Sequence, residues 1–157
     1  MDTTYIVLDG YTAELSADGT IMTWRLDEYF FKDLRSDDFL MTQLHSAQFM
    51  GLGPSPFETS PMRSAEIYAN INLRNQSNTT QNNSYNVLGI VNVDVDVSSN
   101  TVASVVSSQV HPSFTTNRFN EISIYCDFHG NSLDFTTNVV GVDVAWCKFI
   151  LRITKMK

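Results

Sequence analysis

The chain has 157 residues, of which 43% are hydrophobic and 17% are charged, and its formal net charge at pH 7 is -7. This length suits one domain that buries its own core, and the composition is that of a globular protein rather than a disordered or fibrous one. The excess of negative charge argues against a protein that mainly grips nucleic acid, because such binding depends on clustered Lys and Arg. We therefore expect a single domain, residues 1–157, with no specific nucleic-acid partner.

The start of the sequence shows no basic-then-apolar leader, because Met1–Thr4 runs directly into the strand-like Tyr5–Leu8. No apolar run approaches the roughly 20 residues that a membrane helix requires. We expect no membrane insertion, and synthesis in a reducing cytosol or nucleus. In that setting Cys126 and Cys147, each on the apolar face of a predicted strand, are interpreted as buried thiols rather than as a cross-strand disulfide.

In chain order, alternating apolar and polar residues predict eight strands. Their ranges are Thr4–Leu15, Ile21–Leu26, Phe39–Gln48, Ala65–Leu73, Val87–Val97, Val102–Val110, Asn120–Phe128 and Val142–Thr154. The first is interrupted at Asp9-Gly10, and a hairpin-type turn at Ala17–Thr20 follows it. Residues 28–36 fit either an extended segment or a short helix, and the sequence leaves that choice open.

Two long loops are predicted between the strands, at about residues 50–64 and 74–85. The first holds three of the four prolines, which exclude regular structure. The second is almost wholly Asn, Gln, Ser and Thr and is too polar to bury. Its three glycosylation sequons, at Asn75, Asn78 and Asn82, are interpreted as accidents of that composition.

The last two strands carry the clearest pattern. Ile122, Ile124, Cys126 and Phe128 share one face, and so do Ala145, Cys147, Phe149, Leu151 and Ile153. His129-Gly130-Asn131 permits the chain reversal after the first of these strands. Many strands with polar turns and almost no helix indicate an antiparallel sandwich or barrel, and eight strands suit an all-β jelly-roll sandwich.

Residues that could carry chemistry are not grouped in any recognised motif. His45, His111 and His129 lack the spacing of metal ligands, and neither cysteine lies beside a His or Lys that would activate it. Asp94 and Asp96 could begin a calcium site, but a solvated strand face is the favoured interpretation. The sequence therefore predicts no catalytic residue, metal ligand or cofactor, and a protein that presents surfaces rather than an enzyme.

The strand count, the run Tyr85–Val91 after a polar loop, and the closing segment Asn120–Ile153 resemble single jelly-roll capsid proteins of virophages, Polinton-like viruses and large eukaryotic double-stranded DNA viruses. In that lineage a penultimate strand is followed by a Gly-Asn-type turn, a hydrophobic residue and a terminal strand. The matching positions are Asp127, Gly130, Asn131, Leu133 and Phe135.

The resemblance implies a structural subunit of the virion capsid, assembled in the host cytoplasm or nucleus. It points to the penton, which would form a homopentamer at icosahedral five-fold vertices and contact the major capsid protein; a minor capsid role is the nearest variant. Ring closure needs an apolar or aromatic contact surface. The candidate interface residues are Tyr68, Tyr125, Trp146 and Phe57.

Two other classes of function are compatible with such a fold. A lectin-like, carbohydrate-binding module would use the outward aromatic residues as a sugar platform and Asp94 with Asp96 for calcium. A cupin-type enzyme would need a cluster of metal-binding histidines, which the three histidine positions do not offer.

Overall fold

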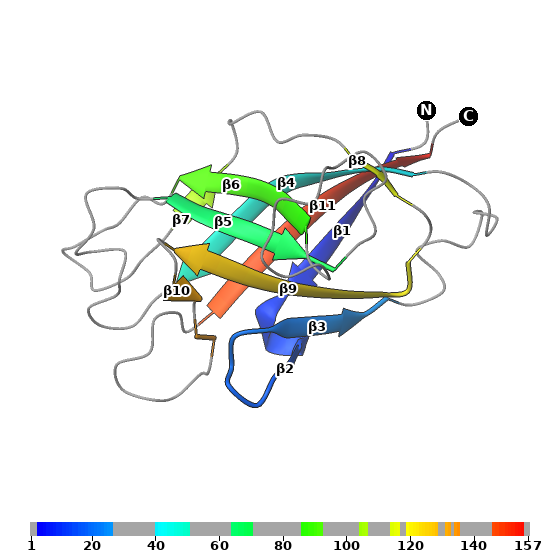
Figure 1. Cartoon of the computed structure of the whole chain (residues 1–157). Helices are drawn as coiled ribbons and strands as arrows, with labels where there is room; N and C mark the ends of the chain where they lie inside the picture. Colours follow the sequence, from blue (N-terminus) through cyan, green and yellow to red (C-terminus); the bar gives the residue numbers. More distant parts are fainter. Residues whose placement is uncertain are drawn as a thin grey trace.

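The fold is an antiparallel β-sandwich of two sheets packed around one core, seen in a computed structural model (Figure 1). The structure describes residues 3–26, 40–50, 64–70, 86–92, 104–106, 114–116, 119–128, 131–132, 134–135 and 146–155. The predicted two-layer, all-β architecture is confirmed. Among the described residues, the single helical element is the 3-10 turn η1 (Gly10–Thr12).

Sheet A has the strand order β1-β11-β4-β7, with β8 also paired to β4. Its strands are β1 (Thr3–Asp9), β4 (Leu40–Met50), β7 (Ser104–Val106), β8 (Phe114–Thr116) and β11 (Trp146–Lys155). Both β7 and β8 run antiparallel to β4, at its two ends. They therefore act as one interrupted edge strand, where the sequence had predicted the single strand Val102–Val110.

Sheet B has the strand order β2-β3-β9-β5-β6, with β10 also paired to β9. Its strands are β2 (Glu14–Leu15), β3 (Met22–Arg25), β5 (Ser64–Ala69), β6 (Asn86–Asn92), β9 (Glu121–Phe128) and β10 (Asn131–Ser132). In Figure 1 these strands cross in front of those of sheet A. The predicted reversal after β9 is confirmed, because Phe128 pairs with Asn131.

The first predicted strand, Thr4–Leu15, is interrupted at Asp9-Gly10 as predicted, but its two parts belong to different sheets. It divides at Gly10 into β1 in sheet A and β2 in sheet B. The Asp9 side chain accepts a hydrogen bond from the Tyr11 amide at 3.0 Å and so caps η1. The Asp9 carbonyl accepts one from the Trp24 indole at 2.7 Å, which ties the end of β1 to sheet B. Gly10 is needed here because a Cβ would lie 2.8 Å from the carbonyl oxygen of Cys147.

The core lies between the two sheets. It is built from every second side chain along each strand, the one that points toward the opposite sheet. At its centre Phe149 of β11 makes edge-to-face contacts with Trp24 of sheet B and Phe49 of β4, with ring centroids 6.0 and 5.9 Å apart. Both cysteines are buried free thiols, as interpreted from the sequence, and Cys147 lies 3.2 Å from the sulfur of Met22. Burial raises the pKa of both thiols.

The strand β4 carries a β-bulge that the sequence analysis did not predict. Leu44 pairs with Leu151 and Ser46 with Ile150, so His45 is the extra residue. The inward side of β4 therefore changes from Leu44 before the bulge to Ala47 after it. A second irregularity lies on β6, where Ile67 pairs with Gly89 and Tyr68 with Val87.

The predicted long loops fall mostly outside the described residues. Residues 51–63 and 71–85 are not described, while Met50 and Ser64 belong to strands β4 and β5. The predicted loop at about 50–64 is therefore shorter by these two residues. The open segment 28–36 and the Asp94/Asp96 pair also lie outside the described part of the chain.

Candidate functional site

The outward side of sheet B carries a group of interacting polar and aromatic side chains. We call it face B; its members are Glu14, Thr23, Arg25, Glu66, Tyr68, Asn70, Glu121, Ser123, Tyr125 and Asp127. Strand alternation places them there, because their sequence neighbours on β3, β5 and β9, such as Trp24, Ile67 and Ile124, are buried in the core.

Two tyrosines form the centre of face B. Tyr68 of β5 lies directly opposite Tyr125 of β9, and the rings stack with centroids 4.7 Å apart and planes 3° from parallel. The Tyr68 hydroxyl donates a hydrogen bond to Glu66. Partial burial raises the pKa of Tyr68, and this hydrogen bond and the Glu66 charge raise it further. The phenol is therefore neutral throughout the physiological range and acts as a donor.

Two carboxylates lie opposite each other beside the tyrosines. Glu66 of β5 pairs in register with Asp127 of β9, one step beyond Tyr68 and Tyr125 on the same face. Like charges directly opposite across two strands are destabilising. In addition, Asp127 Oδ1 is buried without a hydrogen-bond partner within the described structure. Such an atom is an exception in folded proteins and calls for an explanation.

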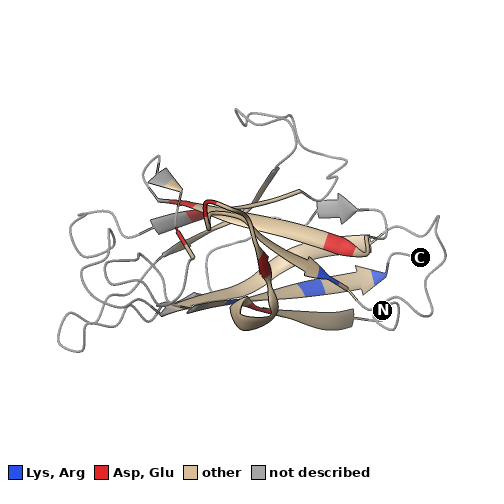
Figure 2. Cartoon of the chain, turned by 90° about the horizontal axis from the view of Figure 1, so that it is seen from below, with Lys and Arg blue, Asp and Glu red and all other residues tan. Residues whose placement is uncertain are grey.

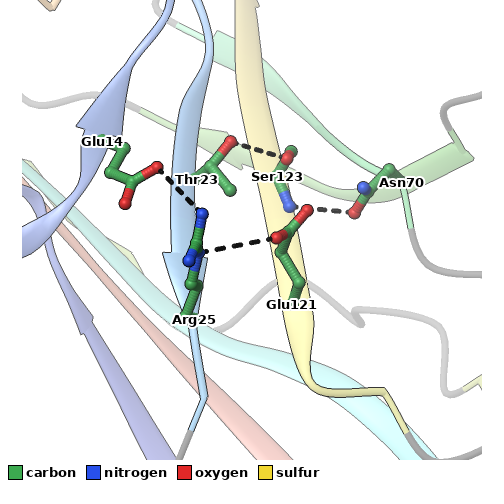
Figure 3. A network of polar contacts seen from close by, with 6 residues as sticks. All are labelled: Glu14, Thr23, Arg25, Asn70, Glu121 and Ser123. Atoms are coloured by element: carbon green, nitrogen blue, oxygen red, sulfur yellow. Dashed lines mark hydrogen bonds and ion pairs between the residues drawn. The ribbon is translucent and has the colours of Figure 1, made fainter.

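The other end of face B is internally satisfied (Figure 3). The Ser123 amide donates to Asn70 Oδ1 at 2.8 Å, and the Ser123 and Thr23 hydroxyls are 2.7 Å apart. Arg25 lies 3.9 Å from Glu14 and 4.0 Å from Glu121. These ion pairs are exposed and loose, so they contribute little to stability. The positive charge of Arg25 nevertheless offsets the two carboxylates at this end of face B. The end that holds Glu66 and Asp127 is therefore the more acidic one.

The outward side of sheet A, which we call face A, has a different character. Tyr5 and Val7 on β1 are 50% and 52% exposed, and Ile150 of β11 lies opposite Val7. Tyr5 reaches across β11 to contact His45 edge-to-face, with ring centroids 5.2 Å apart. Alternation along β4 places His45 on the outward side, because Leu44 before it is buried. Together, these residues form an exposed apolar cluster.

Two cationic side chains flank this cluster along β11. Arg152 lies opposite Tyr5, and Lys148 lies opposite Asp9, on either side of Ile150. Figure 2 shows blue segments along the strand that ends beside the C-terminus, which is β11. Face A is thus an apolar cluster flanked by Arg152 and by Lys148 with Asp9 opposite it, whereas face B is an aromatic pair with carboxylates beside it and Arg25 at its other end.

The four predicted interface residues have different outcomes. Tyr68 and Tyr125 lie on the outward face as predicted and are brought together as a stacked pair. Trp146 begins β11 opposite Met50, but its side chain is outside the described set, and so is all of Phe57. Sequence reasoning missed Tyr5, Val7 and His45. All three could have been found as outward positions, because alternation places Tyr5 and Val7 opposite the side of Ile6, and His45 opposite the side of Leu44.

The described residues offer limited means for chemistry. They contain no group of three or more His, Cys, Asp or Glu side chains that could hold a metal ion. No helix in the described part of the chain has the length and apolar character needed to cross a membrane. The tyrosine pair is also poorly suited to be a sugar platform, because each ring turns one face toward the other.

Comparison with known proteins adds no assignment. No model of a known protein family matches the sequence, and no curated protein is detectably similar to it.

Proposed function

We propose that this chain is a single jelly-roll capsid subunit that assembles as a closed ring, the homopentameric penton of an icosahedral virus. The observation that carries the proposal is the order in which the strands pair. The pairing order supports the jelly-roll fold. The function is then inferred from that fold together with the resemblance in the closing segment.

The pairing order is that of a long hairpin rolled into two layers. Count β1, β3, β4, β5, β6, the interrupted β7/β8, β9 and β11 as eight strands. The first then pairs with the eighth, the second with the seventh, the third with the sixth and the fourth with the fifth. Two further pairings, of β11 with β4 and of β9 with β5, complete the sheets. This arrangement supports a jelly roll, which consists of two Greek keys in two sheets.

The closing segment supports the capsid interpretation through named positions. Asp127 lies near the end of β9 and Asn131 begins β10, so the reversal falls where the resemblance to capsid proteins requires it. Phe135, which follows, is buried in the core. Its amide donates to the Gly19 carbonyl at 2.8 Å, which holds the segment after β10 against the β2–β3 turn. Gly130 and Leu133 lie outside the described residues.

A structural role is also favoured by where the reactive groups lie. The two thiols are buried and their raised pKa values suppress the nucleophilic thiolate form. His45 is on an open strand face with an aromatic neighbour. The surfaces instead offer aromatic and apolar residues among charges, which is the composition of a protein interface. The partners in this proposal are further copies of the chain, the major capsid protein and minor capsid proteins of the virion.

Electron microscopy of the purified full-length chain tests this function. The proposal predicts ring-shaped particles with five-fold symmetry, formed by the chain alone. Particles of the same size as a single sandwich at every concentration would contradict the penton role.

A further inference from the structure

We infer that face B of one copy packs against face A of the next copy, so that the ring is closed by the opposite sides of the sandwich. This inference rests on the proposed ring assembly and specifies the surfaces that form it. Faces A and B lie on opposite sides of the molecule, because each is the outward side of one of the two packed sheets. A contact that uses both leaves no unmatched surface inside a closed ring.

Charge complementarity favours unlike faces over like ones. The Glu66 and Asp127 carboxylates lie in one row of face B, whereas Arg152 and Lys148 lie on face A. A two-fold contact that brings the Glu66/Asp127 rows of two copies together would oppose carboxylates, and one that brings their Arg152 positions together would oppose cations. Both are unfavourable, so these charges favour a head-to-tail contact, which generates a ring when its rotation closes and an open filament when it does not.

The apolar centres also match. Face B presents the stacked Tyr68 and Tyr125, and face A presents Tyr5, Val7 and Ile150. On face A, Arg152 is one outward position away from Ile150; on face B, Glu66 is one outward position away from Tyr68. When the apolar centres meet, a cation can therefore reach the carboxylates. Aromatic and apolar residues at the centre with charges around them are typical of a protein interface.

The contact explains one unfavourable feature of the isolated chain. Glu66 and Asp127 lie directly opposite each other on β5 and β9, and like charges at such positions are destabilising. A guanidinium from the next copy would offset the charge of this pair, because its N–H groups match carboxylate geometry. Arg152 is the exposed arginine on face A and is the side chain that we assign to this role.

A charge exchange tests the pairing on the full-length chain. Glu66→Arg and Arg152→Glu are each expected to reduce the pentamer fraction at least tenfold, measured by native mass spectrometry at one concentration. The double variant is expected to restore the pentamer. Urea unfolding of each variant verifies the fold.

A second test removes an apolar side chain from face A. Tyr5→Ser should weaken the pentamer, because Tyr5 is part of the apolar centre of that face. Tyr11→Ser is the matched control: Tyr11 is 75% exposed and lies in η1, on neither face, so its loss should leave the pentamer intact.

The outcomes separate this inference from the proposed function. If the wild-type chain forms pentamers and the single charge variants do so equally well, the ring stands and the pairing of faces is overturned. If instead both single variants lose the pentamer and the double variant does not regain it, the assignment of Arg152 to the Glu66 and Asp127 pair is overturned. A wild-type chain that is always monomeric would contradict the penton function itself.

Discussion

Truncating Phe149 is the sharpest test of the two-layer core. Its side chain is fully buried, and it contacts Trp24 from the opposite sheet and Phe49 from its own. Phe149→Ala removes the ring and leaves a cavity, which costs about 3–5 kcal/mol in unfolding free energy. Phe149→Leu keeps much of the volume but loses two edge-to-face contacts worth about 0.5–1.5 kcal/mol each, so about 1–3 kcal/mol is expected.

Urea unfolding, followed by tryptophan fluorescence, measures these losses. With a slope of about 2 kcal/mol per molar urea, Phe149→Ala should lower the unfolding midpoint by about 2 M. Leu15→Ala is the matched control, because Leu15 is an apolar strand residue that is 42% exposed, and it should cost no more than about 0.5 kcal/mol. Equal costs for Phe149→Ala and Leu15→Ala would refute the placement of Phe149 between the sheets.

Three further predictions concern the turn at Gly10, the carboxylate pair and the thiols. Gly10→Ala should cost about 1–3 kcal/mol in urea unfolding, because the new Cβ would lie 2.8 Å from the Cys147 carbonyl oxygen; wild-type stability would show that this approach is not tight. Asp127→Asn should stabilise the isolated chain by about 0.2–1 kcal/mol, since it removes a like charge opposite Glu66, and a loss of stability would contradict the repulsion. Cys126 and Cys147 should resist an aromatic disulfide reagent until urea unfolds the chain, and rapid labelling of the folded chain would contradict their burial. The pKa values of both thiols are raised in the folded state, so the thiols ionise first in the unfolded chain. The free energy of unfolding should therefore fall by about 1.4 kcal/mol per pH unit for each thiol above about pH 8.5. The Cys→Ala double variant should lack that dependence on pH.

Much of the sandwich could be predicted because its strands have one buried side. In β9, Ile122, Ile124 and Cys126 are buried while Tyr125 is not, and a period of two is visible in the sequence itself. The same holds for Cys147, Phe149 and Leu151 in β11. The turn at Asp18-Gly19 was also predictable, since Gly19 adopts a φ of 73° and Asp18 Oδ1 accepts hydrogen bonds from Ser16 and Thr20.

The errors arose where the period of two breaks. The bulge at His45 changes which side of β4 is buried, so Leu44 and Ala47 are both core residues although three positions separate them. That change of phase was a signal in the sequence. The break at Asp9-Gly10 was predicted, but alternation could not show that the two parts of Thr4–Leu15 join different sheets, because that depends on strand pairing with distant segments.

The candidate interface could be predicted only in part. Alternation placed Tyr68 and Tyr125 on the outward side, but their stacking depends on the register between β5 and β9, which single strands do not reveal. The same register brings Glu66 opposite Asp127. The contact of Tyr5 with His45 depends on the strand order of sheet A, which single strands do not reveal either.

The central claim is that this sandwich works through its outer faces by joining copies of itself into a closed ring. The mass of the purified full-length chain, recorded by native mass spectrometry over a range of concentrations, tests it most directly. The account predicts a discrete pentamer that dissociates to monomer without stable dimers in between. A chain that stays monomeric at the highest concentration, or that stops at a dimer, would contradict it.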